Sequence, residues 1–455
     1  MKLPRALTIA GSDSGGGAGI QADLKTFAAL GVHGMSAITS ITAQNTYQVS
    51  KIIDLDPEMV VEQIRVCVED IGVDAIKTGM LHKKETIIAV SQELSSLKVP
   101  IVVDPVMVAK SGAKLLEDEA IEALKKYLIP ISTVLTPNAK EAEALTGIPV
   151  TDLKSQRKAA KMLADLGARA IVVKGGHISG SEVVDLLYVD DEYYEYKSNR
   201  LSDNTTHGTG CVFASAIAAE LAKGSNIKDA VLTAKNFVAD AIRFGLELGK
   251  GVGPVNPVWT VYRQSSLYKA IESVRRAVEL LEQLDNAGRL SPESMINIAE
   301  AIPNAQNIMD VVGIPGRIAK VGNRLKANSC PSPGGSRHVA NAVLTLSSIN
   351  PSIRAAMNIA YSETLIELAK KIGLSVSSYD RREEPEDVKK KEGMTIIWGV
   401  RRAYESAGRI TDLIYHKGDW GKEPMILIIG RNAEELVEKF SKLLKEYMRI
   451  TQSQE

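Results

Sequence analysis

A glycine-rich turn leads directly into an alanine-rich segment in NTTHGTGCVFASAIAAELA, residues 204–222. Because the first N–H groups of a helix have no acceptor within it, a helix that starts here would bind an anion, such as a phosphoryl group in transfer. Cys211 lies at the expected helix start, where the helix dipole would stabilise a thiolate, so it is a candidate base for a hydroxyl proton. The alternative for Cys211 alone is a buried cysteine of a packed helix, the commoner role of a free cysteine.

Polar residues also follow three short, Val- and Ile-rich segments in this half of the chain. Asp104 follows PIVV, and Lys174 follows AIVV. Asn138 and Glu141 open a helix-like segment after TVLTP. Transfer of a phosphoryl group from a nucleotide needs carboxylates for a metal ion, cations for the phosphates and a base near the acceptor hydroxyl. All these residue types are present, although each one alone could equally be a turn cap, a solvated helix face or a surface lysine.

The segments that must position these residues alternate between strand-like and helix-like patterns over residues 1–248. Short apolar runs separated by helical patterns are typical of parallel strands buried on both faces, and this order predicts an α/β layer with right-handed crossovers. Since ligands bind beyond the carboxyl ends of such strands, the polar residues are expected at one edge of the sheet. The predicted strands are 6–10, 35–42, 49–56, 74–79, 100–105, 133–137 and 170–176, and the predicted helices are 20–30, 84–97, 117–128, 138–146 and 154–167, with another that starts at Asp56-Pro57-Glu58.

The glycine-rich segment GSDSGGGAGIQAD, residues 11–23, follows the first predicted strand. Gly17, Gly19 and Ala22 match the dinucleotide-binding pattern G-x-G-x-x-[GA], but the acidic residue expected at the end of the second strand is absent. No Gly-Lys-[Ser/Thr] follows either, so the segment is not a Walker P-loop.

Seven motifs of the first half occur together in the order of a known family: AGSDSGGGAGIQADLKTF, SITAQNT, DAIKTGML, DPVMVAKSG, TPNAKEAEALTG, VVKGGH and THGTGC. Residues 1–250 therefore resemble hydroxymethylpyrimidine/phosphomethylpyrimidine kinase, of the ribokinase-like superfamily. The resemblance implies a three-layer αβα domain with a mostly parallel sheet. It also implies phosphorylation of 4-amino-5-hydroxymethyl-2-methylpyrimidine, and then of its monophosphate, by Mg-ATP. A pyridoxal-type alcohol is the alternative substrate, since such vitamin kinases share the glycine–cysteine loop.

The resemblance assigns roles to individual residues. Cys211 would be the base, with Gly208 and Gly210 in the anion hole. The amide of Gln44 would bond to the aminopyrimidine edge, because an amide both donates and accepts. The residues expected to bind the pyrimidine are Gly11, Asp23, Gln44, Met80 and Val106; those expected to bind ATP or phosphate are Lys110, Asn138, Lys174 and Thr209; and those expected to hold Mg²⁺ are Asp104 and Glu141.

A second pair of glycine- and proline-rich turns carries basic residues beyond residue 300. One is Ile314-Pro315-Gly316-Arg317, and the other is Pro333-Gly334-Gly335-Ser336-Arg337-His338, which leads into the apolar run VANAVLTL. If that run is a helix, its start offers another anion site beside Arg337 and His338. The alternative is a pair of solvated surface turns.

Glycine and proline also concentrate in GKGVGPVNPVW, residues 249–259, which predicts a linker. We therefore expect a kinase domain at 1–250, a linker at 251–262 and a second, smaller α/β domain at 263–455. The helices expected in the second domain are 260–288, one from 291, 352–372 and 432–448, and the expected strands are 394–400 and 424–430.

The motifs VGIPGRI, SPGGSRHVA, YDRREEP and GDWGKEP resemble the thiamin-phosphate synthase domain that is often fused behind this kinase and is unrelated to the TIM-barrel synthase. The resemblance implies coupling of hydroxymethylpyrimidine diphosphate with 4-methyl-5-(2-hydroxyethyl)thiazole phosphate. Arg317 and His338 match an arginine and a histidine 21 residues apart in that family and would be catalytic, with Arg337 binding substrate. The alternative is a domain that binds thiamin phosphate and regulates the kinase. The carboxylates that could assist Mg²⁺ are Asp380 and Asp412.

The 455 residues include 55 Lys and Arg and 55 Asp and Glu, so the formal net charge is zero. Nucleic-acid and membrane-surface proteins usually show a basic excess, so we expect small-molecule ligands and neither of those partners. The three cysteines are widely spaced, no run approaches about 18 apolar residues, and the first apolar run is too short for a signal peptide. These features predict a cytoplasmic protein, and we also expect a homo-oligomer.

Overall fold

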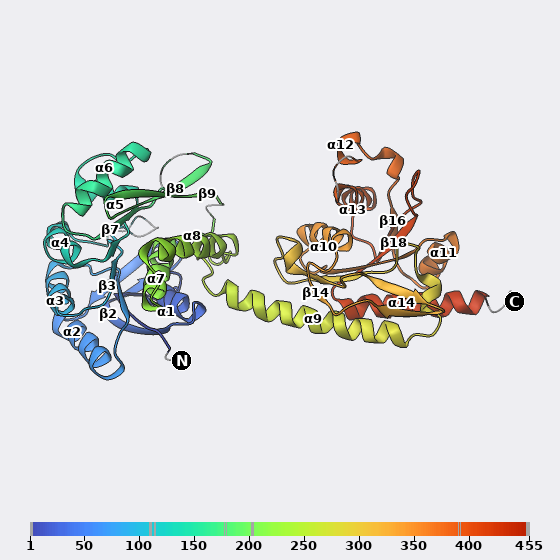
Figure 1. Cartoon of the computed structure of the whole chain (residues 1–455), viewed down its shortest axis with the longest axis horizontal. Coiled ribbons are helices and arrows are strands. Elements are labelled where there is room, and N and C mark those ends of the chain that lie inside the picture. The colour runs from blue at the N-terminus through green and yellow to red at the C-terminus, as the bar shows by residue number, and fades with distance from the viewer. Residues whose placement is uncertain are drawn as a thin grey trace. The chain divides into compact units, whose positions relative to one another are not determined.

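The computed structural model describes residues 3–108, 112, 115–176, 178, 180–201, 204–389, 391 and 393–451. The chain forms two units, residues 1–261 and 262–455, and each has its own large β-sheet (Figure 1). The boundary between the units falls within helix α9 (Trp259–Gln283).

The first unit contains a nine-stranded sheet in the order β3-β2-β1-β4-β5-β6-β7-β8-β9. Neighbouring strands from β2 to β7 are parallel, while β3, β8 and β9 pair antiparallel at the two edges. The parallel core confirms the predicted α/β layer with a mostly parallel sheet. The strands are β1 (Arg5–Asp13), β2 (His33–Gln44), β3 (Val49–Asp54), β4 (Ala75–Thr78), β5 (Ile101–Val103), β6 (Val134–Leu135), β7 (Ala170–Val173), β8 (Glu182–Val189) and β9 (Glu192–Asn199).

Helices cover both faces of this sheet, because successive side chains of each buried strand point to opposite cores. In β4, for example, Ile76 packs in the core beneath α2 and α3, whereas Ala75 packs against α7 and α8. This confirms the three-layer αβα architecture. One face carries α1 (Gly19–Ala29), α7 (Thr209–Ala222) and α8 (Ile227–Arg243), and the other carries α2 (Pro57–Val66), α3 (Lys84–Ser95), α4 (Asp118–Ala123), α5 (Ala139–Thr146) and α6 (Leu153–Ala164).

The second unit has a mixed seven-stranded sheet in the order β14-β11-β10-β15-β18-β17-β16. Its strands pair antiparallel except for β16 and β17, so this sheet is built differently from the first. A separate hairpin joins β12 (Ile318–Val321) to β13 (Arg324–Ala327). The sheet strands are β10 (Ile298–Ala301), β11 (Val311–Gly313), β14 (Ser332–Pro333), β15 (Ala355–Ala360), β16 (Val376–Ser378), β17 (Leu413–His416) and β18 (Met425–Gly430).

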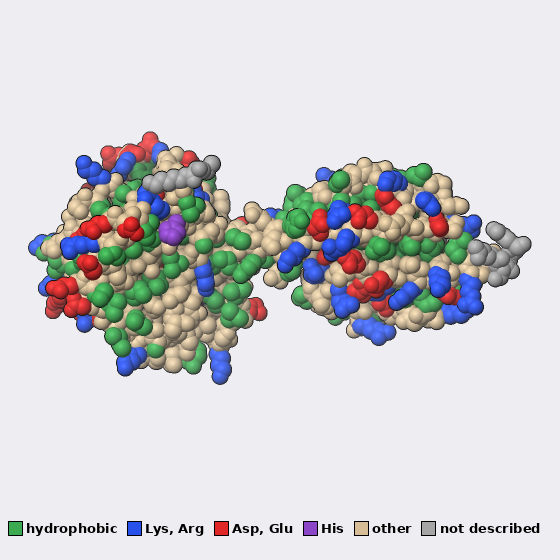
Figure 2. Space-filling view, turned by 90° about the horizontal axis from the view of Figure 1, so that it is seen from below, with side chains coloured by type: hydrophobic (Ala, Val, Ile, Leu, Met, Phe, Trp, Pro, Cys, Tyr) green, Lys and Arg blue, Asp and Glu red, His purple; other side chains and the backbone are tan. Residues whose placement is uncertain are grey.

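Helices again cover the second sheet on both sides (Figure 1). The helices α10 (His338–Ile349) and α13 (Met394–Ala407) pack on one face, while α14 (Ala433–Thr451) packs on β10, β15 and β18 from the other. An ion pair between Arg276 and Glu434 (2.7 Å) links α9 to α14. Acidic and basic side chains are interspersed on the visible face of this unit (Figure 2). The remaining helices are α11 (Glu363–Lys371) and α12 (Glu386–Lys389).

Three expected elements of the second unit are wrong. Residues 394–400, expected as a strand, belong to the helix α13. Gly393 caps the start of this helix and Gly408 caps its end, both in left-handed conformations. Residues 352–372, expected as one helix, form β15 and then α11, because the alanine-rich β15 pairs with both β10 and β18. The segment from residue 291 leads to β10 rather than into a helix. In each case pairing and packing within the unit override a local pattern.

The glycine- and proline-rich segment before α9 is hydrogen-bonded to the first unit. Gly253 donates to Asn204 O (2.8 Å), His207 donates to Gly253 O (3.1 Å), and Val255 donates to His207 O (3.0 Å). A β-carbon on Gly253 would lie 2.2 Å from Leu246 O, so glycine is needed for this close approach. Among the described residues, no helix combines the length and apolarity needed to cross a bilayer.

Candidate functional site

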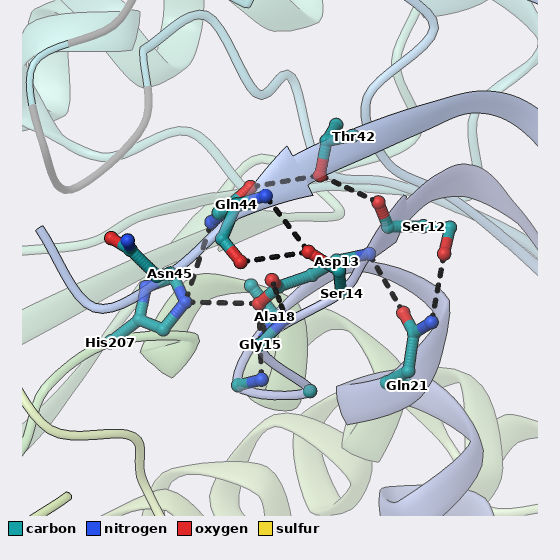
Figure 3. Close-up of polar contacts among 12 residues, drawn as sticks. Ser12, Asp13, Ser14, Gly15, Ala18, Gln21, Thr42, Gln44, Asn45 and His207 are labelled. Atoms are coloured by element: carbon teal, nitrogen blue, oxygen red, sulfur yellow. Dashed lines mark hydrogen bonds and ion pairs between the residues drawn. The ribbon is translucent and has the colours of Figure 1, made fainter. Parts of the chain in front are cut away.

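Asp13, the last residue of β1, is the centre of a hydrogen-bond network at the carboxyl end of the first sheet (Figure 3). Its Oδ1 accepts from the Gly15 N–H (2.8 Å), and its Oδ2 accepts from the N–H groups of Gly17 and Ala18 (3.0 and 2.8 Å). The same Oδ2 lies 3.1 Å from Nε2 of His207. The carboxylate thus joins the glycine-rich turn after β1 to the segment that precedes α7.

These two segments touch backbone to backbone, which requires glycine on both sides. Gly208 has a φ of +85°, and a β-carbon on it would lie 1.9 Å from the carbonyl oxygen of Gly17. A β-carbon on Gly17 would in turn lie 2.5 Å from Cδ2 of His207. The contact therefore sets where α7 begins, with Gly208 as its N-cap residue.

The start of α7 lies over a buried ion pair. Nζ of Lys174 lies 3.1 Å from Oδ1 of Asp104. A β-carbon on Gly210 would lie 3.4 Å from that Nζ and 3.5 Å from Oδ2 of Asp104. The fold therefore brings Gly210, Lys174 and Asp104 together, as expected. The free N–H groups at the start of α7 lie beside the cation of Lys174 and the carboxylate of Asp104. The Thr209 hydroxyl closes the turn by donating to Thr206 O (2.7 Å).

A second buried ion pair joins Lys77 of β4 to Asp23 of α1 (2.8 Å), and both side chains are 0% exposed. Asp23 also accepts from the hydroxyls of Thr8 (2.7 Å) and Ser215 (2.6 Å). Asp23 was expected to line the pyrimidine pocket, and that role stays a prediction; its carboxylate is buried and accepts hydrogen bonds from three donors. Lys77 was missed, although a lysine within a buried apolar strand is a signal that the sequence does carry.

Burial raises the pKa of the Cys211 thiol to about 12; Lys77 opposes this, Asp23 and Asp104 add to it, and a hydrogen bond from Gly19 N–H lowers it. The base role expected of Cys211 stays a prediction. In the protein without bound ligands, burial and two nearby carboxylates oppose the thiolate that the helix start would stabilise. Lys77 and the start of α7 are the groups that favour the thiolate.

Glu141 and Asn138 form a capping box at the start of α5. The Glu141 N–H donates to Asn138 Oδ1 (3.0 Å), and the Asn138 N–H donates to Glu141 Oε2 (2.8 Å). Burial raises the pKa of Glu141 to about 7, while Lys174 opposes the shift and Asp104 adds to it. A divalent cation would relieve this repulsion between two buried carboxylates, and Mg²⁺ commonly takes one or two protein carboxylates with phosphate and water. Among the described residues, no group of three or more His, Cys, Asp or Glu side chains is arranged for a metal.

The other residues expected to bind the pyrimidine lie near the ends of β1, β4 and β5. A β-carbon on Gly11 would lie 3.0 Å from Cε of Met80, so these two residues are adjacent. Val106 turns tightly after Asp104, donating its N–H to the Asp104 carbonyl (2.8 Å). Lys110, expected to bind phosphate, lies outside the described residues.

Gln44 ends β2, and its backbone is fixed by Ser14, whose hydroxyl donates to Gln44 O and accepts from Gln44 N–H (both 2.8 Å). The two termini of its side-chain amide lie 3.5 Å from His207 Nε2 and 3.4 Å from Thr42 Oγ1 (Figure 3). These long contacts leave hydrogen-bonding capacity for a ligand. His207 and Asp13, neither of which was predicted as a site residue, connect Gln44 to the start of α7.

In the second unit, four basic side chains face one region. Burial lowers the pKa of His338, and Arg381 and Arg317 lower it further, although His338 keeps contact with solvent at the start of α10. Burial also lowers the pKa of His416 to about 4, with Arg381 and His338 adding to the shift. Arg317 has a φ of +69° and donates to Ser294 O. The predicted pair Arg317 and His338 is therefore in electrostatic range, and Arg381 and His416, which were missed, complete the cluster.

Arg381 is the least satisfied member of this cluster. Its side chain is 13% exposed, and its one ion pair within the described residues is a 3.5 Å contact from Nη2 to Oε2 of the buried Glu384. Its Nε is buried and has no hydrogen-bond partner in the described part of the chain. A buried guanidinium with an unused donor can bind an oxyanion such as a diphosphate. Arg337 is exposed beside His338, at the N-cap of α10.

The two carboxylates suggested for Mg²⁺ in this unit are engaged elsewhere. Asp380 is paired with the exposed Arg382 (2.5 Å). Asp412 is paired with Lys439 (2.8 Å) and precedes β17, whereas His416 is the last residue of that strand. Each carboxylate thus already has a cationic partner, and Asp412 lies at the far end of the strand from the cluster, so this geometry does not favour the suggestion, which stays a prediction for both.

Known proteins match both units. Residues 13–256 match the phosphomethylpyrimidine kinase family, and residues 273–442 match the family described as thiamine-phosphate synthase ThiN. The hydroxymethylpyrimidine/phosphomethylpyrimidine kinase of Streptomyces coelicolor is 48% identical over 258 residues, 57% of this chain and 96% of that protein. The thiamine biosynthesis bifunctional protein ThiED of Geobacter sulfurreducens is 48% identical over 253 residues, 55% of this chain, and the match spans only 52% of that protein.

Solved structures give the same fold for the first unit. The ADP complex of Bacillus subtilis pyridoxal kinase superposes with a TM-score of 0.53 at 39% identity, covering 56% of this chain and 97% of that one. Staphylococcus aureus pyridoxal kinase with AMP-PCP and pyridoxal gives 0.53 at 38% identity, covering 57% and 94%. The chain belongs to the phosphomethylpyrimidine kinase family and carries a C-terminal domain of the thiamine-phosphate synthase ThiN family.

Proposed function

We propose that the first unit phosphorylates 4-amino-5-hydroxymethyl-2-methylpyrimidine and its monophosphate, and that the second unit couples the diphosphate to 4-methyl-5-(2-hydroxyethyl)thiazole phosphate. The products of the second step are thiamin phosphate and diphosphate. The observation that carries the kinase proposal is the start of α7 over the Lys174–Asp104 pair, next to Gln44 and His207. The observation that carries the synthase proposal is the cluster of two arginines and two histidines at α10.

In the kinase step, the substrate hydroxyl oxygen attacks the γ-phosphorus of ATP, and ADP leaves. The hydroxyl proton passes to the Cys211 sulfur in its thiolate form, after the thiol has released its own proton to solvent. Lys77 and the α7 start offset part of the cost of that ionisation in a buried site. The free N–H groups of Gly210 and Cys211 stabilise the phosphoryl oxygens in transfer, and Lys174 supplies a fixed cation beside them. The co-substrate is ATP, in keeping with a similar kinase solved with AMP-PCP.

Asp104 and Glu141 are the residues that would hold Mg²⁺. The ion neutralises charge on the nucleotide phosphates when it is bound. The fit rests on two buried carboxylates, of which Asp104 helps to raise the pKa of Glu141, and on their position beside Lys174.

In the coupling step, the bond between the pyrimidine methylene carbon and the diphosphate oxygen breaks, and its electron pair leaves with the diphosphate. The lone pair of the thiazole nitrogen forms the new carbon–nitrogen bond, so no proton transfer is needed. The protein must stabilise the leaving diphosphate and align the two rings. Arg317, Arg381 and the start of α10 supply donors for this, and His338 can donate through a ring N–H.

A pyridoxal-type alcohol is the second candidate substrate of the first unit, because pyridoxal kinases are among the similar solved structures. A regulatory domain that binds thiamin phosphate is the alternative for the second unit, and the unused Nε donor of Arg381 suits either ligand. We also propose a cytoplasmic homo-oligomer. Ile41 and Ile53 pair across β2 and β3 and are 51% and 54% exposed, which favours association through that edge.

The complete reaction is tested with the purified full chain, the aminopyrimidine alcohol, ATP, Mg²⁺ and the thiazole phosphate. We expect thiamin phosphate by mass spectrometry, and none without ATP unless the pyrimidine diphosphate is supplied. Pyridoxal replaces the alcohol in a parallel assay, and preferential turnover of pyridoxal would contradict the substrate. Failure to couple supplied diphosphate would contradict the synthase and favour the regulatory domain.

The base role predicts that Cys211→Ala lowers the kinase kcat by about 10²- to 10⁴-fold, because general base catalysis is lost. Coupling of supplied pyrimidine diphosphate serves as the internal control and should not change. The matched control Cys67→Ala removes a thiol far along the chain from the α7 start and should leave both rates near wild type. Near-normal phosphorylation by Cys211→Ala would rule out the base.

Glu141→Gln should raise the Mg²⁺ concentration for half-maximal kinase activity by about tenfold or more, since a ligand charge is lost. The glutamine oxygen still accepts the Asn138 N–H, so the cap of α5 is retained. Glu143→Gln, which changes an exposed carboxylate on the same helix, is the matched control. An unchanged Mg²⁺ titration in Glu141→Gln would mean that Glu141 only caps the helix.

Arg381→Ala should lower the coupling rate by about 100-fold or more, because a donor to the leaving diphosphate is removed. Arg382→Ala removes the neighbouring guanidinium, which is exposed and paired with Asp380, and should change the rate little. Kinase activity and melting temperature check that each variant is folded. Arg381→Lys keeps the charge, so its coupling rate should lie between those of the wild type and Arg381→Ala. Equal effects of the two alanine variants would contradict the assignment.

A further inference from the structure

The hairpin HKGDWGKEP, residues 416–424, joins β17 to β18 and begins with His416. Its two arms are hydrogen-bonded to each other, from Asp419 N–H to Lys422 O (3.2 Å) and from Lys422 N–H to Asp419 O (2.8 Å). Gly418 has a φ of +80°, and a β-carbon on it would lie 2.4 Å from Lys422 O. The close packing of this turn therefore fixes the position of the Gly418 N–H.

The Gly418 N–H determines which nitrogen of His416 carries the proton. It donates to Nδ1 of His416 (3.1 Å). Because a backbone N–H can only donate, Nδ1 must accept and carries no proton, and the proton of the neutral ring lies on Nε2. Burial lowers the pKa of His416 to about 4, with Arg381 and His338 adding to the shift, so the ring is neutral at neutral pH.

The parallel pair of β16 and β17 brings His416 to the same end of the sheet as Arg381. Ser378 aligns with Tyr415, and the Tyr379 N–H donates to Tyr415 O (3.2 Å), so Tyr379 runs alongside His416. The rings of Tyr379 and His416 pack with their centroids 5.2 Å apart. The chain reaches Arg381 two residues after Tyr379. The hairpin and the strand pair thus hold the imidazole next to the guanidinium.

Two hydrogen-bond donors at this edge of the sheet are available to a ligand. Within the described part of the chain, the His416 ring makes no hydrogen bond besides that from Gly418, so its Nε2–H is unused. Nε of Arg381 is buried and also has no hydrogen-bond partner among the described residues. A neutral N–H beside a guanidinium adds a donor without adding a second charge. Two donors and no acceptor at this point fit an oxyanion.

We propose that His416 is a catalytic residue of the coupling step, which donates from Nε2 to the departing diphosphate together with Arg381. As the bond between the methylene carbon and the diphosphate oxygen breaks, its electron pair goes to that oxygen. The Nε2–H donates a hydrogen bond to the diphosphate and keeps its proton, and Gly418 acts only as a positioning residue through the His416 ring. The inference rests on the proposed coupling reaction and deepens it by naming a further group that binds the leaving group.

Three substitutions of His416 separate a donor at Nε2 from packing of the ring. Glutamine can place its NH₂ group near the position of Nε2, whereas asparagine places it near Nδ1 and phenylalanine has no donor. His416→Phe and His416→Asn should lower kcat for coupling of supplied pyrimidine diphosphate by about 10²- to 10³-fold, because a donor to the developing charge is lost. His416→Gln should restore most of that loss. Equal losses in all three variants would overturn the proposal, since a packing role does not distinguish glutamine from asparagine.

Gly418→Ala tests whether the hairpin acts through the ring. The new β-carbon would collide with Lys422 O and move the Gly418 N–H, so coupling should slow by about tenfold or more although His416 is intact. Gly421→Ala is the matched control, because Gly421 also has a positive φ (+68°) but a β-carbon on it meets nothing within 4 Å. Its coupling rate should stay near wild type. Equal losses in the two variants would rule out the positioning role of Gly418.

The protonated nitrogen is observed directly by NMR of the wild-type full chain labelled with ¹⁵N-histidine, with His416→Gln identifying the His416 signals. We expect the ¹⁵N shifts of a protonated Nε2 and an unprotonated Nδ1 at neutral pH. Saturating inorganic diphosphate should shift the Nε2 signal, because that N–H donates to the anion. A proton on Nδ1, or an Nε2 signal that diphosphate leaves unchanged, would contradict the proposal.

The outcomes also separate this inference from the proposed synthase function. If wild type does not couple supplied pyrimidine diphosphate although inorganic diphosphate shifts the Nε2 signal, the synthase proposal fails and the oxyanion contact at His416 stands. If wild type couples the substrates and His416→Phe couples them equally fast, the coupling function stands and the role of His416 is refuted.

Discussion

The Asp13 carboxylate is the interaction on which the first site depends. It accepts three backbone N–H groups of one turn and the His207 N–H from a segment almost 200 positions away in the chain. Hydrogen bonds to a charged acceptor contribute about 1.5–3 kcal/mol each, which offsets the conformational cost of the glycines that let the two segments touch. Without this acceptor, neither the glycine-rich turn nor the start of α7 would have a fixed place.

The charges beneath α7 come in compensated pairs. Lys77 with Asp23 and Lys174 with Asp104 place two cations and two carboxylates near the Cys211 sulfur. Removing one partner of such a pair costs about 3–5 kcal/mol, whereas an apolar replacement of both is often tolerated, so stability alone does not explain them. The two ion pairs do supply a fixed electrostatic field in a buried site. That field is nearly neutral overall, so a nucleotide that arrives with its own cation does not have to overcome a net charge.

The sequence was sufficient to predict much of the fold and site of the first unit, and less of those of the second. Buried parallel strands read as continuous Val- and Ile-rich runs, and polar residues at their ends meet at one sheet edge, so Asp104, Lys174 and Gly210 were found together. Asp13 was overlooked because its role depends on a histidine distant in sequence. In the second unit, sheet pairing decided between strand and helix for residues 355–360, and no local pattern reports such pairing. Arg381 and His416 lie in separate segments and meet only in the fold.

The electrostatic requirement of the reaction proposed for the second unit differs from that of the first. The coupling reaction needs no base, so nothing is gained from an ionised side chain that takes a proton. The cluster instead lowers the pKa of His338 and of His416, through burial and through the nearby guanidinium of Arg381. Neutral imidazoles can donate a hydrogen bond without adding to the repulsion between Arg317 and Arg381. The unsatisfied Nε of Arg381 carries a cost of about 1–3 kcal/mol in the absence of a ligand. In the proposed coupling step, an oxyanion bound there would remove that cost. Tighter binding of the leaving group as its charge develops is the requirement for catalysis of this step.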